Sequence, residues 1–316
     1  MNPNYLFMVR CLFYFMTALA CAVVNAALPH AVHAAGYVHQ SVTVTRDHAS
    51  LRIGGGDVFL KAEEVHAGER FEVQHHYVDA AGKVWLGVEQ DGRELWLCKA
   101  DGRIENTLDE IPAKPFSRQH LPKIYLSPSR QPYNAYAVGN TNEMVQMEAL
   151  AAELATLLET KYGCEVCVAP SRLRIAATGR PADASAKGCD VYLALHSNAS
   201  ADGRRHNGAE AYYYAASEQS RQLAEGVVRE LNTISAVPPD GAAGAVSAME
   251  YFDYFGYGEV RDPSDLGMIA VLAEVEYHDN PAGARRILCQ RTQLAEALAR
   301  AVADLWERTT STRPER

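Results

Sequence analysis

The sequence predicts an α/β fold, in which helices cover a mostly parallel sheet, preceded by a small all-β domain. Three observations support this. The chain has 316 residues, of which 48% are hydrophobic and 22% charged, as in globular proteins. Short β-type segments separated by Gly and Asp-Gly turns precede a proline-rich stretch. Beyond that stretch, strand-like and helix-like segments alternate.

The first 34 residues are expected to be a secretory signal peptide. An apolar run from Cys11 to Val24 follows Arg10, and small-residue cleavage sites end at Ala26 and Ala34. The run is short for a membrane span of ~20 residues. We therefore expect a secreted or periplasmic, cell-wall-associated protein without a stable membrane span after cleavage. An uncleaved anchor and lipidation at Cys21 are the alternatives.

Charge and cysteine content narrow the possible partners. The chain has 30 Lys+Arg and 39 Asp+Glu, a net charge of −9, and no basic block, which argues against nucleic acid as a partner. Five cysteines follow the leader, an odd number that does not suggest a disulfide framework. Cys164 and Cys167 fit a strand in the core better than a metal or redox pair. One disulfide, involving Cys189, remains possible.

Residues 37–105 alternate in the period of β-strands and turn at Gly and Asp-Gly pairs. Their order is similar to that of bacterial SH3-like domains, with an opening VTVT strand, a glycine-rich segment at Gly54 and strands centred on Trp85 and Trp96. That resemblance implies binding to cell-wall peptide, although both tryptophans fit core positions equally well. Residues 106–122 contain three prolines and are expected to be a linker.

Residues 123–310 are expected to form the larger domain. The periodicity predicts strands at 123–127, 165–169, 189–196, 209–215 and 268–277, and helices at 141–161, 217–235 and 281–307. This order indicates βαβ units and hence a mostly parallel sheet. Ligands of such sheets bind beyond the carboxyl ends of the strands.

Ionisable residues lie at those ends. His196 ends an apolar strand, where a structural histidine is the simpler interpretation, and Glu143 begins a helix in a capping-box pattern with Asn140. Period two places Glu274, Glu276 and His278 on one face of a strand. Together, a histidine, a glutamate and a further ligand would suit zinc, with a spare carboxylate to act on water.

The segment from Ile124 onward resembles the catalytic domain of zinc-dependent N-acetylmuramoyl-L-alanine amidases, which cut the amide between N-acetylmuramic acid and the stem peptide of peptidoglycan. The matching blocks are IYLSPS, GNTNE before the first helix, Arg180 ten residues before Asp190, the strand CDVYLALHSNA, GAEAYY and VLAE ending at Glu274. The resemblance implies that Glu143 and His196 bind Zn²⁺, that Glu274 is the general base, and that peptidoglycan is the substrate.

The sequence departs from that family at its first zinc ligand. Where the family has Asp-Pro-Gly-His, this chain has Ser127-Pro-Ser-Arg-Gln131. We hypothesise that His278 supplies the missing nitrogen, with Gln131 and Asn134 as weaker substitutes. Arg130 would engage a substrate carboxylate, or is simply an exposed arginine.

The remaining expectations concern the substrate groove. Asn198, Glu276 and Arg261 are expected to line it, with Glu259 as another candidate, and the long segment 236–267, rich in aromatic residues, to form its rim. A stray helix or a disordered flap is the alternative for that segment. Two other functions remain open: an inactive amidase-fold protein that binds peptidoglycan, and a zinc carboxypeptidase acting on stem peptides.

Overall fold

A computed structural model of the chain describes residues 38–200, 206–234, 244–248 and 257–307. The expected signal peptide and residues 251–256, four of which are aromatic, lie outside these ranges. Within them, no helix is both long and apolar enough to cross a membrane.

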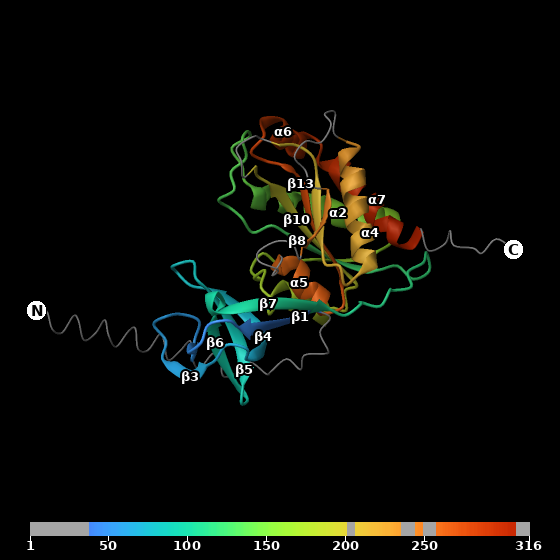
Figure 1. Cartoon of the computed structure of the whole chain (residues 1–316). Coiled ribbons are helices and arrows are strands. Elements are labelled where there is room, and N and C mark those ends of the chain that lie inside the picture. The colour runs from blue at the N-terminus through green and yellow to red at the C-terminus, as the bar shows by residue number, and fades with distance from the viewer. Residues whose placement is uncertain (1–37, 201–205, 235–243, 249–256, 308–316) are drawn as a thin grey trace, which may run out of the picture. The chain divides into compact units, whose positions relative to one another are not determined.

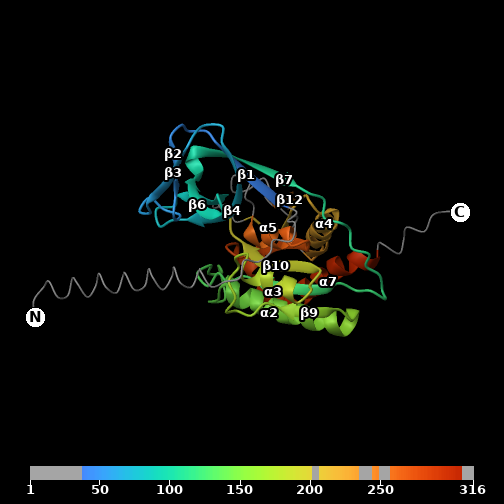
Figure 2. The same cartoon turned by 90° about the horizontal axis from the view of Figure 1, so that it is seen from below.

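Seven antiparallel strands form the N-terminal sheet (Figures 1 and 2). They are β1 (Val38–Val44), β2 (Ala49–Arg52), β3 (Lys61–Val65), β4 (Arg70–Val78), β5 (Val84–Gln90), β6 (Arg93–Cys98) and β7 (Gly102–Leu108), in the order β3-β2-β6-β5-β4-β1-β7. A 3₁₀ turn at Lys99–Asp101 joins β6 to β7. Alternate aliphatic side chains of these strands share one buried cluster, as period two predicts.

The two tryptophans of this sheet differ in environment. Trp85 is fully buried and its indole N–H donates to Asp79 Oδ2 at 3.0 Å, so it is a core residue. Trp96 is half-buried and contacts Tyr77 edge to face. The likeness to SH3-like domains stays a prediction.

Residues 109–122, after β7, contain no helix or strand, but part of this stretch is packed rather than free. Phe116 is buried in the core of the C-terminal domain, and Ile111 N–H donates to the carbonyl of Ala216. The segment expected to be a linker is therefore anchored at these two residues.

The C-terminal domain is a mixed α/β fold, as expected. Its strands are β8 (Lys123–Pro128), β9 (Glu165–Val168), β10 (Val191–Asn198), β11 (Glu210–Tyr213), β12 (Ala245–Ser247) and β13 (Ile269–Tyr277), in the order β12-β11-β13-β10-β8-β9. The strands β9, β8, β10 and β13 run parallel, and β11 pairs antiparallel with β13. The helices are α2 (Glu143–Leu157, continued by a π turn at Leu158–Tyr162), α3 (Arg180–Ala186), α4 (Glu218–Asn232), α5 (Gly258–Asp265), α6 (Pro281–Cys289) and α7 (Arg291–Glu307).

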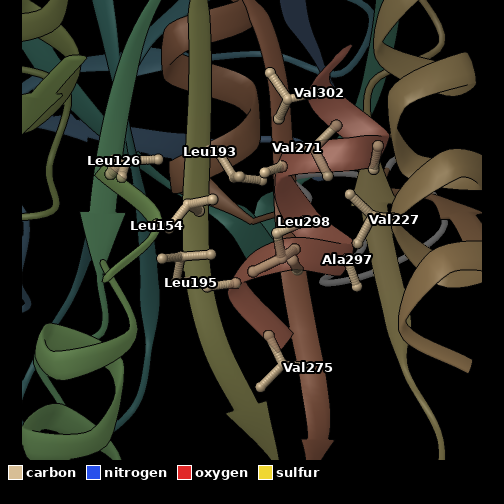
Figure 3. Close-up of a cluster of buried hydrophobic side chains, with 14 of the residues drawn as sticks. Leu126, Leu154, Leu193, Leu195, Val227, Val271, Val275, Ala297, Leu298 and Val302 are labelled. Atoms are coloured by element: carbon tan, nitrogen blue, oxygen red, sulfur yellow. The ribbon is translucent and has the colours of Figure 1, made fainter. Parts of the chain in front are cut away.

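Helices cover both faces of this sheet. Leu126, Leu193 and Val271 point to the face packed by α2, α4 and α7, as Figure 3 shows. Tyr125 and Tyr192, one position out of phase, point to the opposite face with α3 and α5. Parallel strands buried on both faces explain why β10 is a continuous run of buried residues from Val191 to Ser197.

Three details refine the sequence prediction. The C-terminal helical region is two helices, with the break at Gln290. The segment 236–267 contains β12 and α5, so a helix occupies part of the expected irregular rim. The five described cysteines, Cys189 among them, have free thiols.

Candidate active site

The site lies at the carboxyl ends of β8, β10 and β13. The register pairs Leu195 with Pro128 on one side and His196 with Glu274 on the other, and Glu274 with Glu210 of β11. The parallel pairing therefore brings the ends of three strands that are distant in sequence to one edge of the sheet.

His196 is held between two carboxylates. Its Nδ1 lies 2.9 Å from Glu143 Oε1 and its Nε2 lies 2.8 Å from Glu259 Oε2. All three side chains are nearly fully buried. Both ring nitrogens act as donors in this arrangement, which requires the imidazolium form.

Glu259, in the first turn of α5, is bound by hydroxyl groups at its other oxygen. Ser127 Oγ donates to Glu259 Oε1 at 2.5 Å, and Tyr192 O–H lies 3.1 Å from the same oxygen. Arg180 is completely buried and donates through Nη1 to Ser127 Oγ and to the carbonyl of Pro128. This chain of contacts fixes the position of Glu259 beside His196.

Glu143 reaches the site because another residue caps its helix. The N-cap of α2 is Asn142, whose side chain accepts from Val145 N–H, so the expected capping box with Asn140 does not form. Glu143 instead accepts from Asn134 Nδ2 at 2.6 Å and from Ser197 N–H. The first turn of the helix thus directs this carboxylate at His196.

Burial and hydrogen bonding shift the pKa values of His196 and Glu143 in opposite directions. Burial alone would lower the pKa of His196, but its hydrogen bonds to Glu143 and Glu259 raise it well above the ordinary value. Burial would raise the pKa of Glu143, but its hydrogen bond to His196 holds that pKa below the ordinary range. The site therefore contains a charged histidine and an ionised Glu143.

Glu274 differs from the buried Glu143, Glu210 and Glu259 because the residue as a whole is partly exposed. Its Oε2 is nevertheless buried and has no hydrogen-bond partner among the described residues. Burial of the carboxyl raises its pKa to about 8, and the charges of Glu143, Glu210 and Glu259 act in the same direction against that of His196. Glu274 is therefore the site carboxyl that titrates closest to neutral pH, and part of the residue is open to solvent.

Glu276 and His278 do not join Glu274. The pairing of β10 with β13 shifts by one residue between His196 and Asn198, a β-bulge that breaks the period of two on which the sequence argument depended. Glu276 forms an ion pair with Arg286 and accepts from Gly208 N–H at 2.8 Å. His278 Nδ1 lies 2.7 Å from the carbonyl of Ser197, and its ring stacks on Tyr136.

The other expected site residues have diverse positions. Gln131 Nε2 lies 3.3 Å from His196 Nδ1, and Asn134 bridges Gln131 to Glu143, so both border the site. Asn198 donates to Glu210. Arg130 is exposed and donates to the carbonyl of Leu173. Arg261 binds Asp262 Oδ1 at 2.6 Å, and it is Glu259, not Arg261, that contacts His196.

The residues at this site do not make up a zinc ligand set. In the described residues, three His, Cys, Asp or Glu side chains place one ligand atom each within 4.8 Å of one another only at Asp47, His48 and His66, in the N-terminal sheet. Glu143 and His196 are adjacent, but His278 is not grouped with them. In the present arrangement both ring nitrogens of His196 hold protons that are donated to carboxylates, so a metal would have to displace one of them.

The sequence argument did not identify the residues that hold Glu259 in place, namely Ser127, Tyr192 and Arg180. Ser127 and Arg180 entered only as parts of matching blocks, and Tyr192 only as part of an apolar strand. The alternation in β8 and β10 carried a signal, because Ser127 and Tyr192 interrupt otherwise aliphatic strands with hydroxyl groups. Their hydrogen bonds to Glu259 depend on how α5 packs against the sheet, which the periodicity of the strands does not describe.

A search of solved structures finds amidases at low sequence identity. An N-acetylmuramoyl-L-alanine amidase from Clostridium difficile 630 is 20% identical with a TM-score of 0.49, covering 61% of this chain and 99% of that one. AmiC2 of Nostoc punctiforme is 20% identical with a TM-score of 0.48, covering 58% and 95%. A search of curated protein sequences found no match.

A family model described as N-acetylmuramoyl-L-alanine amidase (Amidase_3) matches residues 124–304. The matched range begins within β8 and ends within α7, so it spans the whole C-terminal sheet and contains Glu143, His196 and Glu274. Zinc dependence is a general trait of this family. More than half of the chain fits the model, and the chain therefore belongs to the N-acetylmuramoyl-L-alanine amidase family.

Proposed function

We propose that the site around His196 and Glu274 hydrolyses the amide between N-acetylmuramic acid and L-alanine in peptidoglycan, with Glu274 as the group that transfers the proton. The reaction itself is that of the family. The observation that carries the assignment is the position of Glu274, which lies opposite His196 in the strand register, is a partly exposed residue, and has a pKa of about 8. A catalytic acid or base works best when its pKa lies near the working pH.

A single carboxyl, that of Glu274, can carry out both proton transfers of the reaction. Ionised Glu274 takes a proton from the water that attacks the amide carbonyl. The same carboxyl then gives this proton to the amide nitrogen as the C–N bond breaks, which leaves a lactyl carboxylic acid and the free amine of L-alanine. Because the pKa of Glu274 is about 8, we expect kcat/KM to rise with pH up to that value.

The histidine contributes charge rather than proton transfer. His196 is buried with both nitrogens engaged, so its proton is not free to move. Its positive charge acts on Glu274, and it would stabilise negative charge that develops on the amide oxygen nearby. Glu143 and Glu259 hold the ring in place.

Substrate contacts are proposed for residues at the border of the site. Gln131, Asn134 and Asn198 offer amide groups there, and the exposed Arg130 offers a guanidinium to a stem-peptide carboxylate. Glu276 and Arg261, which are engaged in ion pairs, would support this rim from behind. The N-terminal sheet is proposed to be an SH3-like wall-binding module, and the protein to act outside the cytoplasm.

Because this family is generally zinc-dependent, we also propose that the chain binds zinc. The contacts of the candidate ligands set a condition on such binding. The predicted set of Glu143, His196 and His278 would require His196 to lose a proton and His278 to leave Ser197. No step above therefore depends on a metal. The same saturation of His196 favours a second candidate, an amidase-fold protein that binds peptidoglycan without cutting it.

The test is incubation of purified peptidoglycan with the protein, followed by mass spectrometry of the soluble products. Free stem peptides that begin with L-alanine are expected, and Glu274→Gln should reduce their release by about 10²–10⁴-fold. A chelator arm reports whether a metal is needed. Wall binding without any released peptide would establish the binding-only function, and release of only a terminal amino acid would indicate a carboxypeptidase.

A further inference from the structure

We propose that Asp47, His48 and His66 in the N-terminal sheet form a binding site for a divalent transition-metal cation of the Zn²⁺ class. The proposal concerns a site outside the C-terminal domain and is independent of the proposed hydrolysis.

The fold brings the three residues together from two turns. Asp47 and His48 lie in the turn between β1 and β2, and His66 lies in the turn between β3 and β4. The strands β2 and β3 lie next to each other (Figure 2). They pair antiparallel, with Ala49 opposite Val65. His48 and His66 are the next residues beyond that pair, so the end of the ladder places their rings side by side, with centroids 5.1 Å apart.

The backbone of the first turn is held in an uncommon conformation. His48 has a φ of 57°, in the left-handed region that few residues other than glycine adopt. In the second turn, Gly68 takes the positive φ, so His66 itself is unstrained. These two turns point both imidazoles toward the same space outside the sheet.

The donor atoms lie close enough together to hold a metal ion. One ligand atom from each of Asp47, His48 and His66 lies within 4.8 Å of the others. His66 Nδ1 lies 3.0 Å from Asp47 Oδ1, and His48 Nδ1 lies 2.6 Å from Glu64 Oε1. A histidine whose ring is oriented by a carboxylate is typical of metal sites, where the carboxylate fixes the ring and its tautomer.

The chemistry of the donors selects the class of cation. Two imidazoles with one carboxylate suit zinc and neighbouring first-row metals, whereas Ca²⁺ and Mg²⁺ prefer oxygen ligands. Glu64 would serve as the outer partner of His48 and add negative charge. All four side chains are exposed, so a cation reaches them without rearrangement of the core and water completes its coordination.

The test is calorimetric titration of the purified, chelator-treated protein with ZnCl₂, with CaCl₂ and MgCl₂ in parallel. The double variant His48→Asn/His66→Gln should lose one equivalent of bound zinc, with unchanged hydrolysis and circular dichroism. Asparagine is chosen because it tolerates the left-handed backbone of position 48. Glu64→Gln should weaken binding by about 10–100-fold.

Two control variants make the result specific. His39, exposed and bonded to a single carboxylate, Asp109, is the matched control, and His39→Gln should leave zinc binding unchanged. Glu274→Gln should keep this equivalent of zinc while losing hydrolysis. The proposal fails if the double variant binds zinc as the unmodified protein does, if His39→Gln weakens binding equally, or if Ca²⁺ binds as tightly as Zn²⁺.

Discussion

The His196 cluster and the His48–His66 cluster use the same side-chain types in opposite surroundings. At His196, buried carboxylates engage both nitrogens of one ring. At the N-terminal sheet, each exposed ring meets one carboxylate through Nδ1. Burial makes the first cluster a charged, closed unit, because an unpaired buried charge is costly. Exposure leaves the second cluster open to a cation.

This contrast changes what a metal analysis can show. The family leads one to expect zinc in the C-terminal domain, whereas the donor spacing favours it in the N-terminal sheet. A measured stoichiometry of one zinc per chain would therefore not show which of the two clusters binds it. Variants of each cluster, measured side by side, are needed to assign it.

The largest expected effect is on activity. Glu274→Gln removes the titrating carboxyl but keeps the shape of the side chain, and we expect hydrolysis to fall by about 10²–10⁴-fold. Release of L-alanine-terminated peptides measures it. Glu276→Gln, two positions along the same strand, should retain activity per folded molecule and lower stability, because it weakens an ion pair with Arg286. Equal loss of activity in both variants would contradict the separate roles of these glutamates.

The next effect is on stability at the buried cluster. Glu259→Gln leaves the charged His196 with one carboxylate partner instead of two. Removing one partner of a buried ion pair costs about 3–5 kcal/mol. Denaturant unfolding should show this loss, together with a lower pKa of His196 in NMR titration. A variant as stable as the unmodified protein would mean that water reaches the ring.

The buried cluster also predicts how stability depends on pH. The pKa of Glu274 is about 8 in the folded protein and near 4.5 when unfolded, so the native state binds the extra proton between these values. The pKa of His196 is likewise raised. Both contributions are present at low pH and lost as the pH rises through the folded values. The melting temperature should therefore fall from about pH 5 to 9, and Glu274→Gln should flatten the decline.

Most of the fold could be predicted from the sequence, because buried side chains recur along the chain with the period of a strand or a helix. The alternation of Ile124, Tyr125 and Leu126 matches the two faces of β8, and the apolar stripe of α2 faces the core. The division of the last helical region at Gln290 was missed, since both halves carry continuous helical periodicity.

The site could be predicted only in part. The sequence argument placed His196 and Glu274 at the ends of parallel strands. In the structure they lie opposite each other in the register of β10 and β13. The β-bulge after Glu274 separated Glu276 and His278 from it, and a bulge of one residue leaves no mark in a pattern of alternating side chains. Glu259 reaches His196 from a helix 63 residues away, a long-range contact that local patterns do not contain.

The smallest expected effect is the counterpart of the Glu259 variant at the exposed cluster. Glu64→Gln removes the carboxylate that binds His48 Nδ1, as Glu259→Gln removes one from His196. Because exposed ion pairs are screened by water, we expect no measurable change in denaturant unfolding in the absence of metal. The same substitution should still weaken zinc binding, since a metal gains from an oriented ring. A clear loss of stability without metal would show that His48 and Glu64 hold the turn together, and would remove the distinction between the two clusters.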